Sequence, residues 1–177
     1  MAQAANQGNV RIFLQINGVT GESTDAAYAK QIECTLYKMG IKNQSSVASG
    51  TTGSGSGRAV FEEMELFAPI NSASPTLVQA AASGQTFSNA TITFVKAGGG
   101  TSVVYLTIKL TQVFLSSYDS VYGPTNPNDA SSPLLHVDKY GLTYGSISFA
   151  YNQQTASGGV GAQTVGTYNL LTNAISL

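Results

Sequence analysis

The segment 89–120 constrains the fold of this chain more than any other. Residues 90–96 and 103–115 are rich in Val, Ile, Thr, Tyr and Phe, which suit a pleated and half-buried surface. Three glycines at 98–100 separate the two runs and can take positive φ without steric cost, so the chain can turn back on itself. The pattern predicts a β-hairpin with one unusually long arm, which indicates a strongly curved sheet or a barrel wall.

Further strands are predicted before and after this hairpin. The alternation of apolar residues that is typical of half-buried strands occurs in segments 10–16, 31–41, 59–68 and 141–153. We expect 160–171 to be the last strand. In 31–41 the pattern places Ile32, Cys34 and Leu36 on one face and Tyr37 and Met39 on the other. In 141–153 it places Ile147, Phe149 and Tyr151 inward.

Segment 59–68 is apolar on both faces. Val60, Met64 and Leu66 face one way, whereas the other face carries Phe61, Glu63, Glu65 and Phe67. Contact with a core on one side and with a neighbouring subunit on the other would explain this pattern. The candidate subunit-interface residues are therefore Phe61, Glu63, Glu65 and Phe67.

The sequence predicts one short helix and two loops. Ser74 is a candidate N-cap, Pro75 suits the first helical position, and Gly84 ends a run of about ten residues. Residues 45–57 are almost entirely Ser, Gly and Thr, the composition of a flexible loop. Residues 120–140 contain three prolines with Asn and Asp, which predicts a surface loop.

Composition excludes several classes of protein. The chain has 177 residues, 10% of them charged, and a formal net charge of −1 with no basic run, which argues against a nucleic-acid partner. Cys34 is the single cysteine, so no disulfide can form within the chain. Residues 1–9 lack the features of a signal peptide, and no apolar run is long enough to span a bilayer. We expect synthesis in the cytoplasm and, if the protein is exported, a route that reads no N-terminal signal.

Short motifs spread in order over most of the chain resemble the hemolysin-coregulated protein (Hcp) family, the tube proteins of bacterial type VI secretion. Lys-Ala-Gly-Gly at 96–99 feeding Tyr-Leu-Thr-Ile at 105–108 looks like the central hairpin of that family. The other similar motifs lie at 13–23, 31–33, 39–41, 73–77, 146–150 and 166–169. Two features depart from the family pattern: segment 120–140 is longer than usual, and Tyr168 stands where Trp is common.

The resemblance implies a mainly β protein in which residues 1–177 form a single β-barrel domain with one short helix. It also implies a structural subunit of a closed ring, expected to be a hexamer, that stacks into a tube and is secreted with it. The implied partners are further copies of the chain, a contractile sheath, a spike protein and small effector proteins in the bore. Loop 45–57 corresponds to the family's ring-stacking loop, where the candidate residues are Ser49, Gly50, Gly53, Gly55 and Gly57.

No constellation for chemistry emerges from the sequence. A Ser-His-Asp hydrolase would need a serine within reach of His136 and Asp138, and no Gly-X-Ser-X-Gly elbow stands on a strand-to-helix turn. One histidine and one cysteine cannot build a conventional zinc site. Glu63 and Glu65 share a strand face, which is conceivable for a glycosidase pair, but a solvated or ring-contact face is favoured. We expect no catalytic, cofactor-binding or metal-binding residues.

Two alternative functions remain open. A tail-tube protein of a phage or related contractile particle shares the ring-and-tube architecture, and genomic neighbours would separate the two. A carbohydrate-binding β-sandwich belongs to another class and calls for exposed aromatic platforms, but the chain contains no Trp.

Overall fold

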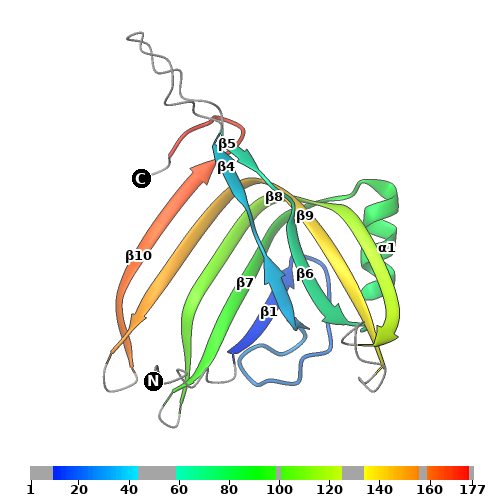
Figure 1. The fold of residues 1–177 in the computed structure, drawn as a ribbon, viewed down its shortest axis with the longest axis horizontal. Helices are drawn as coiled ribbons and strands as arrows, with labels where there is room; N and C mark the ends of the chain where they lie inside the picture. Colours follow the sequence, from blue (N-terminus) through cyan, green and yellow to red (C-terminus); the bar gives the residue numbers. More distant parts are fainter. Residues whose placement is uncertain (1–9, 44–58, 99–100, 125–133, 156–158, 176–177) are drawn as a thin grey trace.

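The computed structural model describes residues 10–43, 59–98, 101–124, 134–155 and 159–175. The strands form an antiparallel eight-stranded sheet that curves around on itself, with one helix at its side (Figure 1). The strands of this sheet are β1 Val10–Ile16, β2 Ile32–Cys34, β3 Leu36–Lys38, β6 Met64–Pro69, β7 Thr86–Gly98, β8 Thr101–Pro124, β9 Leu134–Gln154 and β10 Val160–Asn169. A separate two-stranded ribbon consists of β4 Ile41–Asn43 and β5 Ala59–Phe61, and the helix is α1 Ser74–Ser83.

The sheet closes into a barrel at Thr35. Its strand order is β2-β1-β7-β8-β9-β6-β3, and β10 pairs with β9 beside this path. Only Thr35 separates β2 at one end of the order from β3 at the other. The Thr35 amide donates to the carbonyl of Phe67 on β6 at 2.7 Å, so the two ends of the sheet meet. The predicted mainly β barrel with one short helix is confirmed.

The central hairpin is confirmed and is longer than predicted. Strand β8 runs on to Pro124, and β9 begins at Leu134, with Tyr122 opposite His136. The predicted loop 120–140 is therefore wrong at both ends, because cross-strand pairing extends the ladder up to the prolines that suggested a loop. Residues 125–133 of that segment lie outside the described part of the chain.

Strand β9 divides its second edge between two partners. Residues 137–142 pair with β6, and residues 146–154 pair with β10. A register shift between Leu115 and Ser117 marks a bulge in β8 at the same level as this change of partner. Bulges bend strands and increase their twist, which accounts for the curvature of the barrel wall at this point.

The two strands predicted at 31–41 and 59–68 are each broken. Segment 31–41 bends at Thr35, so Leu36 leaves the buried face that holds Ile32 and Cys34 and is 53% exposed. Segment 59–68 is interrupted after Phe61, and its halves join different sheets. Val60 is consequently exposed, whereas Met64 and Leu66 are buried as predicted. A local period of two cannot reveal these breaks, because tertiary pairing causes them.

Apolar side chains from every wall of the barrel fill its interior. The fully buried residues include Leu14, Met64, Leu66, Ile92, Ile108, Leu110, Tyr140 and Leu142. In β9 the predicted inward face is buried at Ile147 and partly buried at Phe149, but Tyr151 near the strand end is exposed.

Helix α1 covers one part of this core with Leu77 and Ala80. Its end at Gly84, which has a φ of 66°, agrees with the prediction. Its start does not: the N-cap is Ala73 and makes no side-chain capping bond. The hydroxyl of Ser74 points to Asp138 instead. Within the described residues, α1 is too short and too polar to cross a bilayer.

Candidate interaction surface

Glu65 lies in a row of charges that crosses the outer face of the sheet. Its carboxylate accepts from Lys38 on β3 at 3.0 Å and from Lys139 on β9 at 2.9 Å. Lys139 also lies 3.7 Å from Asp119 on β8. Hydrogen bonds from Lys139 first, and then from Lys38, hold the pKa of Glu65 below its usual range. Both lysine partners of the Glu65 carboxylate therefore belong to its own subunit, and these contacts connect β6 with β3 and β9.

Glu63 is also engaged within the subunit. Its Oε1 accepts from Ser116 at 2.6 Å and from Ser117 at 2.7 Å, both in the bulge of β8. To reach them the side chain crosses over Gly141, where an added Cβ would lie 1.7 Å from Glu63 Oε1. Gly141 therefore has to lack a side chain for this contact. The two carboxylates are thus held by different donors, Glu63 by serines of β8 and Glu65 by lysines of β3 and β9.

Phe67 lies beside an open apolar groove, which we call the outer groove. Its volume is about 640 Å³, and its lining residues come from β6, β8 and β9 and from the link at Thr35. The lining residues are Thr35, Phe67, Asp119, Ser120, Val121, Gly123, Leu135, Val137 and Lys139. Val121 is 60% exposed and Leu135 is 44% exposed. Clustered exposed apolar side chains on a folded protein mark a surface that contacts another molecule.

Phe61 does not share this surface. It belongs to β5, and its ring stacks on Tyr168 with centroids 5.1 Å apart and meets the edge of Tyr144 at 6.2 Å. The ring is partly buried against the core. Sequence periodicity placed Phe61 and Phe67 on one face, but the break after Phe61 sends them to different parts of the molecule.

The predicted stacking residues lie outside the described part of the chain. Ser49, Gly50, Gly53, Gly55 and Gly57 all fall within 44–58. The ribbon that brackets this segment is described: Asn43 pairs with Ala59, and Lys42 forms an ion pair with Glu62.

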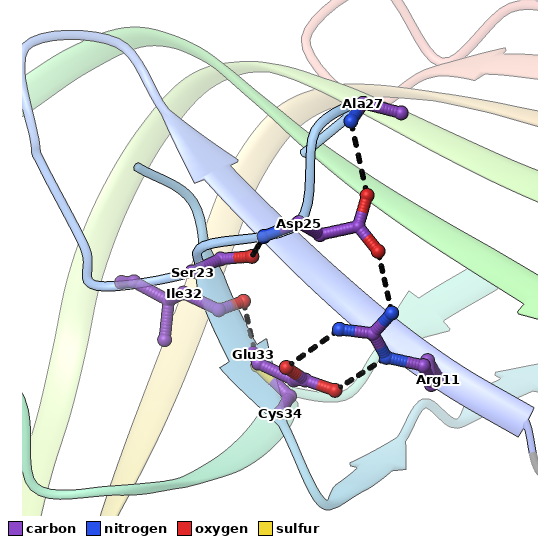
Figure 2. Close-up of polar contacts among 7 residues, drawn as sticks. All are labelled: Arg11, Ser23, Asp25, Ala27, Ile32, Glu33 and Cys34. Atoms are coloured by element: carbon purple, nitrogen blue, oxygen red, sulfur yellow. Dashed lines mark hydrogen bonds and ion pairs between the residues drawn. The ribbon is translucent and has the colours of Figure 1, made fainter. Parts of the chain in front are cut away.

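The β1–β2 connection is held to the barrel by Arg11, as Figure 2 shows. Arg11 Nη1 donates to Asp25 at 2.5 Å, and its Nε donates to Glu33 on β2 at 2.8 Å. The amide of Ala27 at 3.0 Å and the guanidinium of Arg11 both lower the pKa of Asp25, the amide being the larger cause. The ring of Tyr28 stacks on Phe13 of β1 with centroids 4.3 Å apart. The sequence analysis did not predict these contacts, because the residues that form them are far apart along the chain.

Ser120, His136 and Asp138 come together, but not in the order of a hydrolytic triad. The Ser120 hydroxyl lies 2.8 Å from His136 Nε2 and donates to Asp138 Oδ1 at 2.8 Å. Catalysis requires the imidazole between serine and carboxylate, whereas here the serine stands in the middle. His136 was predicted in a loop and lies on β9, exposed as expected.

Burial raises the pKa of the Cys34 thiol well above its usual range, which disfavours the reactive thiolate. Among the described residues, no group of three or more His, Cys, Asp or Glu side chains could hold a metal ion.

Comparisons with known proteins agree on one family. Residues 13–151 match the family model described as type VI secretion system effector, Hcp. The chain is 29% identical over 149 residues to the protein hcp1 of Pseudomonas aeruginosa, covering 84% of this chain and 87% of that protein. A solved structure of a type six secretion system protein aligns with a TM-score of 0.82 at 24% identity, covering 95% of this chain and 100% of the other. Hcp1 from Salmonella typhimurium aligns with a TM-score of 0.72 at 20% identity, covering 94% and 99%.

Proposed function

The chain belongs to the Hcp family of the type VI secretion system, and from this premise we propose that it forms closed hexameric rings that stack into the secretion tube. The family is structural, so the chain is a tube protein and not an enzyme. The outer groove is the observation that best supports ring formation. Its exposed apolar residues cannot be covered by the described part of their own subunit, which has its core elsewhere.

A second copy covers the outer groove in this proposal. Phe67 contributes the apolar contact, while Glu63 and Glu65 stay bound to Ser116, Ser117, Lys38 and Lys139 of their own subunit. A contact between two different surfaces of neighbouring copies closes into a ring when the rotation per subunit divides a full turn. Of the four predicted interface residues, Phe67 is therefore the one that we assign to the neighbour.

The remaining expectations from the family are part of the same proposal. Residues 1–177 act as one domain, and loop 45–57 with its candidate glycines connects successive rings. The tube meets a contractile sheath and a spike protein, carries small effector proteins and is exported by the type VI machine without an N-terminal signal. The family match favours this function over a phage tail tube or a carbohydrate-binding module.

The groove is tested by Val121→Glu. This places a carboxylate beside Asp119, within a surface that the neighbour would cover. An unpaired buried charge costs about 3–5 kcal/mol, so we expect monomers where the wild-type protein forms rings. Native mass spectrometry and negative-stain images at micromolar concentration measure the outcome.

Val78→Glu is the matched control. Val78 is an exposed valine of α1 and does not line the outer groove. It should leave rings intact. Rings that persist in Val121→Glu at wild-type yield would contradict the groove as the subunit contact, and a monomeric wild-type protein would contradict the proposed function itself.

A further inference from the structure

Four side chains form a chain of hydrogen bonds from the surface to the start of helix α1. Ser120 of β8 stands directly opposite Asp138 of β9, and His136 lies two residues away along β9 on the same face of the sheet. The Asp138 carboxylate in turn contacts Ser74, the first residue of α1. Figure 1 shows α1 next to the end of β8. We call the series His136, Ser120, Asp138 and Ser74 the helix-docking chain.

The two ends of the helix-docking chain lie in different surroundings. Asp138 is fully buried and Ser74 is 4% exposed, whereas His136 and Ser120 are exposed. The backbone adds a parallel connection, because the carbonyl of His136 accepts at 3.2 Å from the amide of Ile70, in the segment that leads into α1. The exposed imidazole is therefore linked to the buried start of the helix by three side-chain hydrogen bonds.

The number of hydrogens at Ser120 fixes the direction of its two bonds. The Ser120 Oγ lies 2.8 Å from Asp138 Oδ1 and 2.8 Å from His136 Nε2, but a serine hydroxyl has one hydrogen. An ionised carboxylate only accepts, and two oxygens at this distance need a hydrogen between them, so Ser120 donates to Asp138. The hydrogen between Ser120 and His136 must then belong to the imidazole, on Nε2.

The same count gives the direction of the bond at Ser74. The Ser74 Oγ accepts from the amide of Asn71 at 3.0 Å, so its own hydrogen is available for Asp138 Oδ2. Residues 70–83 contain no Lys, Arg or His, so this segment offers Asp138 no positive charge. Hydroxyl hydrogens on both oxygens must therefore compensate the buried carboxylate for the water that it has lost.

We propose that His136 is a positioning residue for helix α1: its Nε2–H donates to Ser120 and so commits the single Ser120 hydrogen to Asp138, which holds Ser74. The inference concerns the fold of one subunit and goes beyond the proposed function. Position 136 consequently requires a hydrogen-bond donor. An acceptor there competes with Asp138 for the Ser120 hydrogen, leaves a buried carboxylate oxygen without its donor and loosens the first turn of α1.

His136→Gln and His136→Glu test this requirement. The two side chains are nearly equal in size, but the amide can donate to Ser120 whereas the carboxylate can only accept. The Leu77 amide, which donates to Ala73 in the first turn of α1, should exchange in His136→Gln as in the wild-type protein and about tenfold faster in His136→Glu. Amide hydrogen exchange of peptides that cover α1, followed by mass spectrometry, measures the difference.

The same substitutions in Ser120→Ala protein separate hydrogen-bond direction from charge. The carboxylate of His136→Glu also repels Asp138 through space, and this repulsion does not need Ser120. If His136 acts through Ser120, the two variants should differ by less than about twofold once the hydroxyl is gone. A tenfold difference that persists without Ser120 would overturn the proposal, as would equal exchange of the two variants when Ser120 is present.

The hydrogen on the imidazole can be observed in the unsubstituted protein, because His136 is the single histidine of the chain. Nitrogen-15 NMR of histidine-labelled protein at about pH 8, where a histidine ring ordinarily carries one hydrogen, should place that hydrogen on Nε2. A spectrum with the hydrogen on Nδ1 and an accepting Nε2 would overturn the proposal even if every variant folds. None of these outcomes depends on ring formation, so the proposed function stands or falls separately.

Discussion

At the scale of single residues, Asp138 connects helix α1 to two strands of the barrel wall. It is fully buried on β9 and accepts hydrogen bonds from Ser74 at the start of α1 and from Ser120 on β8. Burial, and then Asp138, raise the pKa of the neighbouring Tyr118. A buried carboxylate is stable only when donors surround it, so these hydroxyls fix the helix against the barrel wall.

Ser74→Ala should destabilise the subunit measurably. The substitution leaves one oxygen of a fully buried carboxylate without its donor, which costs about 1–3 kcal/mol. The free energy of unfolding from urea titration measures the loss.

Ser120→Ala is the control, because it removes a second hydroxyl donor to Asp138 from an exposed position where water can replace it. Its loss should be clearly smaller. If both variants lose the same free energy of unfolding, then burial of the contact between Ser74 and Asp138 does not determine its contribution to stability.

At the scale of elements, the β1–β2 connection shows how a segment without regular structure is held in place. Arg11 on β1 binds Asp25 within the connection and Glu33 on β2, while Tyr28 stacks on Phe13. Phe13 is fully buried although it lies apart from the residues of the main core cluster. The connection therefore acts as a cover for one outward-facing aromatic residue of β1.

Lowering the pH should weaken the contact between Arg11 and Asp25, and comparison with Arg11→Met should measure this effect. The folded-state pKa of Asp25 lies below its ordinary value, so its contribution is complete above about pH 4 and is lost as the pH falls through the folded pKa. Arg11→Met should lower the urea midpoint at pH 7, and its gap to the wild-type protein should narrow at pH 3. Some pH dependence should remain, because the Ala27 amide is the larger cause of the shift.

Lys109→Met is the control for charge alone. Lys109 is exposed and makes no ion pair within the described residues. The difference in urea midpoint between Lys109→Met and the wild-type protein should be small at both pH values. A gap for Arg11→Met that stays constant from pH 7 to pH 3 would mean that the ion pair with Asp25 contributes nothing to folding.

At the scale of the whole molecule, the surfaces that we propose for different assembly steps lie on separate parts of the chain. The outer groove involves β6, β8 and β9, and segment 45–57 lies between β4 and β5 of the ribbon. Because these surfaces are separate, a substitution or deletion can abolish one assembly step and leave the other intact. In the proposed assembly, the outer groove acts within a ring and the loop acts between rings.

Shortening loop 45–57 to a few residues should leave rings intact and abolish tubes and secretion. The pairing of Asn43 with Ala59 gives the shortened loop a defined place to close. Negative-stain images of the purified protein and blots of culture medium measure the two effects. Wild-type protein should reach the medium only from cells that have the sheath. Loss of the rings themselves, or undiminished secretion, would contradict the assignment of this loop to stacking.

The sequence by itself determined the features that depend on local rules. The hairpin of β7 and β8, the alternation of β1, and the stop of α1 at Gly84 follow from local residue preferences and the period of two, which neighbouring residues alone specify. The resemblance of short motifs in order was enough for the family. These features required no knowledge of which strands would become neighbours.

Only the tertiary structure decided the rest. Closure of the barrel interrupted the predicted strand at Thr35 and left Leu36 exposed. The break after Phe61 placed its ring against Tyr168 and on a different strand from Phe67. Pairing between β8 and β9 extended strands up to the prolines, and the approach of Ser74 made Asp138 a buried carboxylate rather than a loop charge. Each of these outcomes depends on residues distant in sequence, whose pairing is selected by the free energy of the assembled barrel and not by the propensity of any one segment.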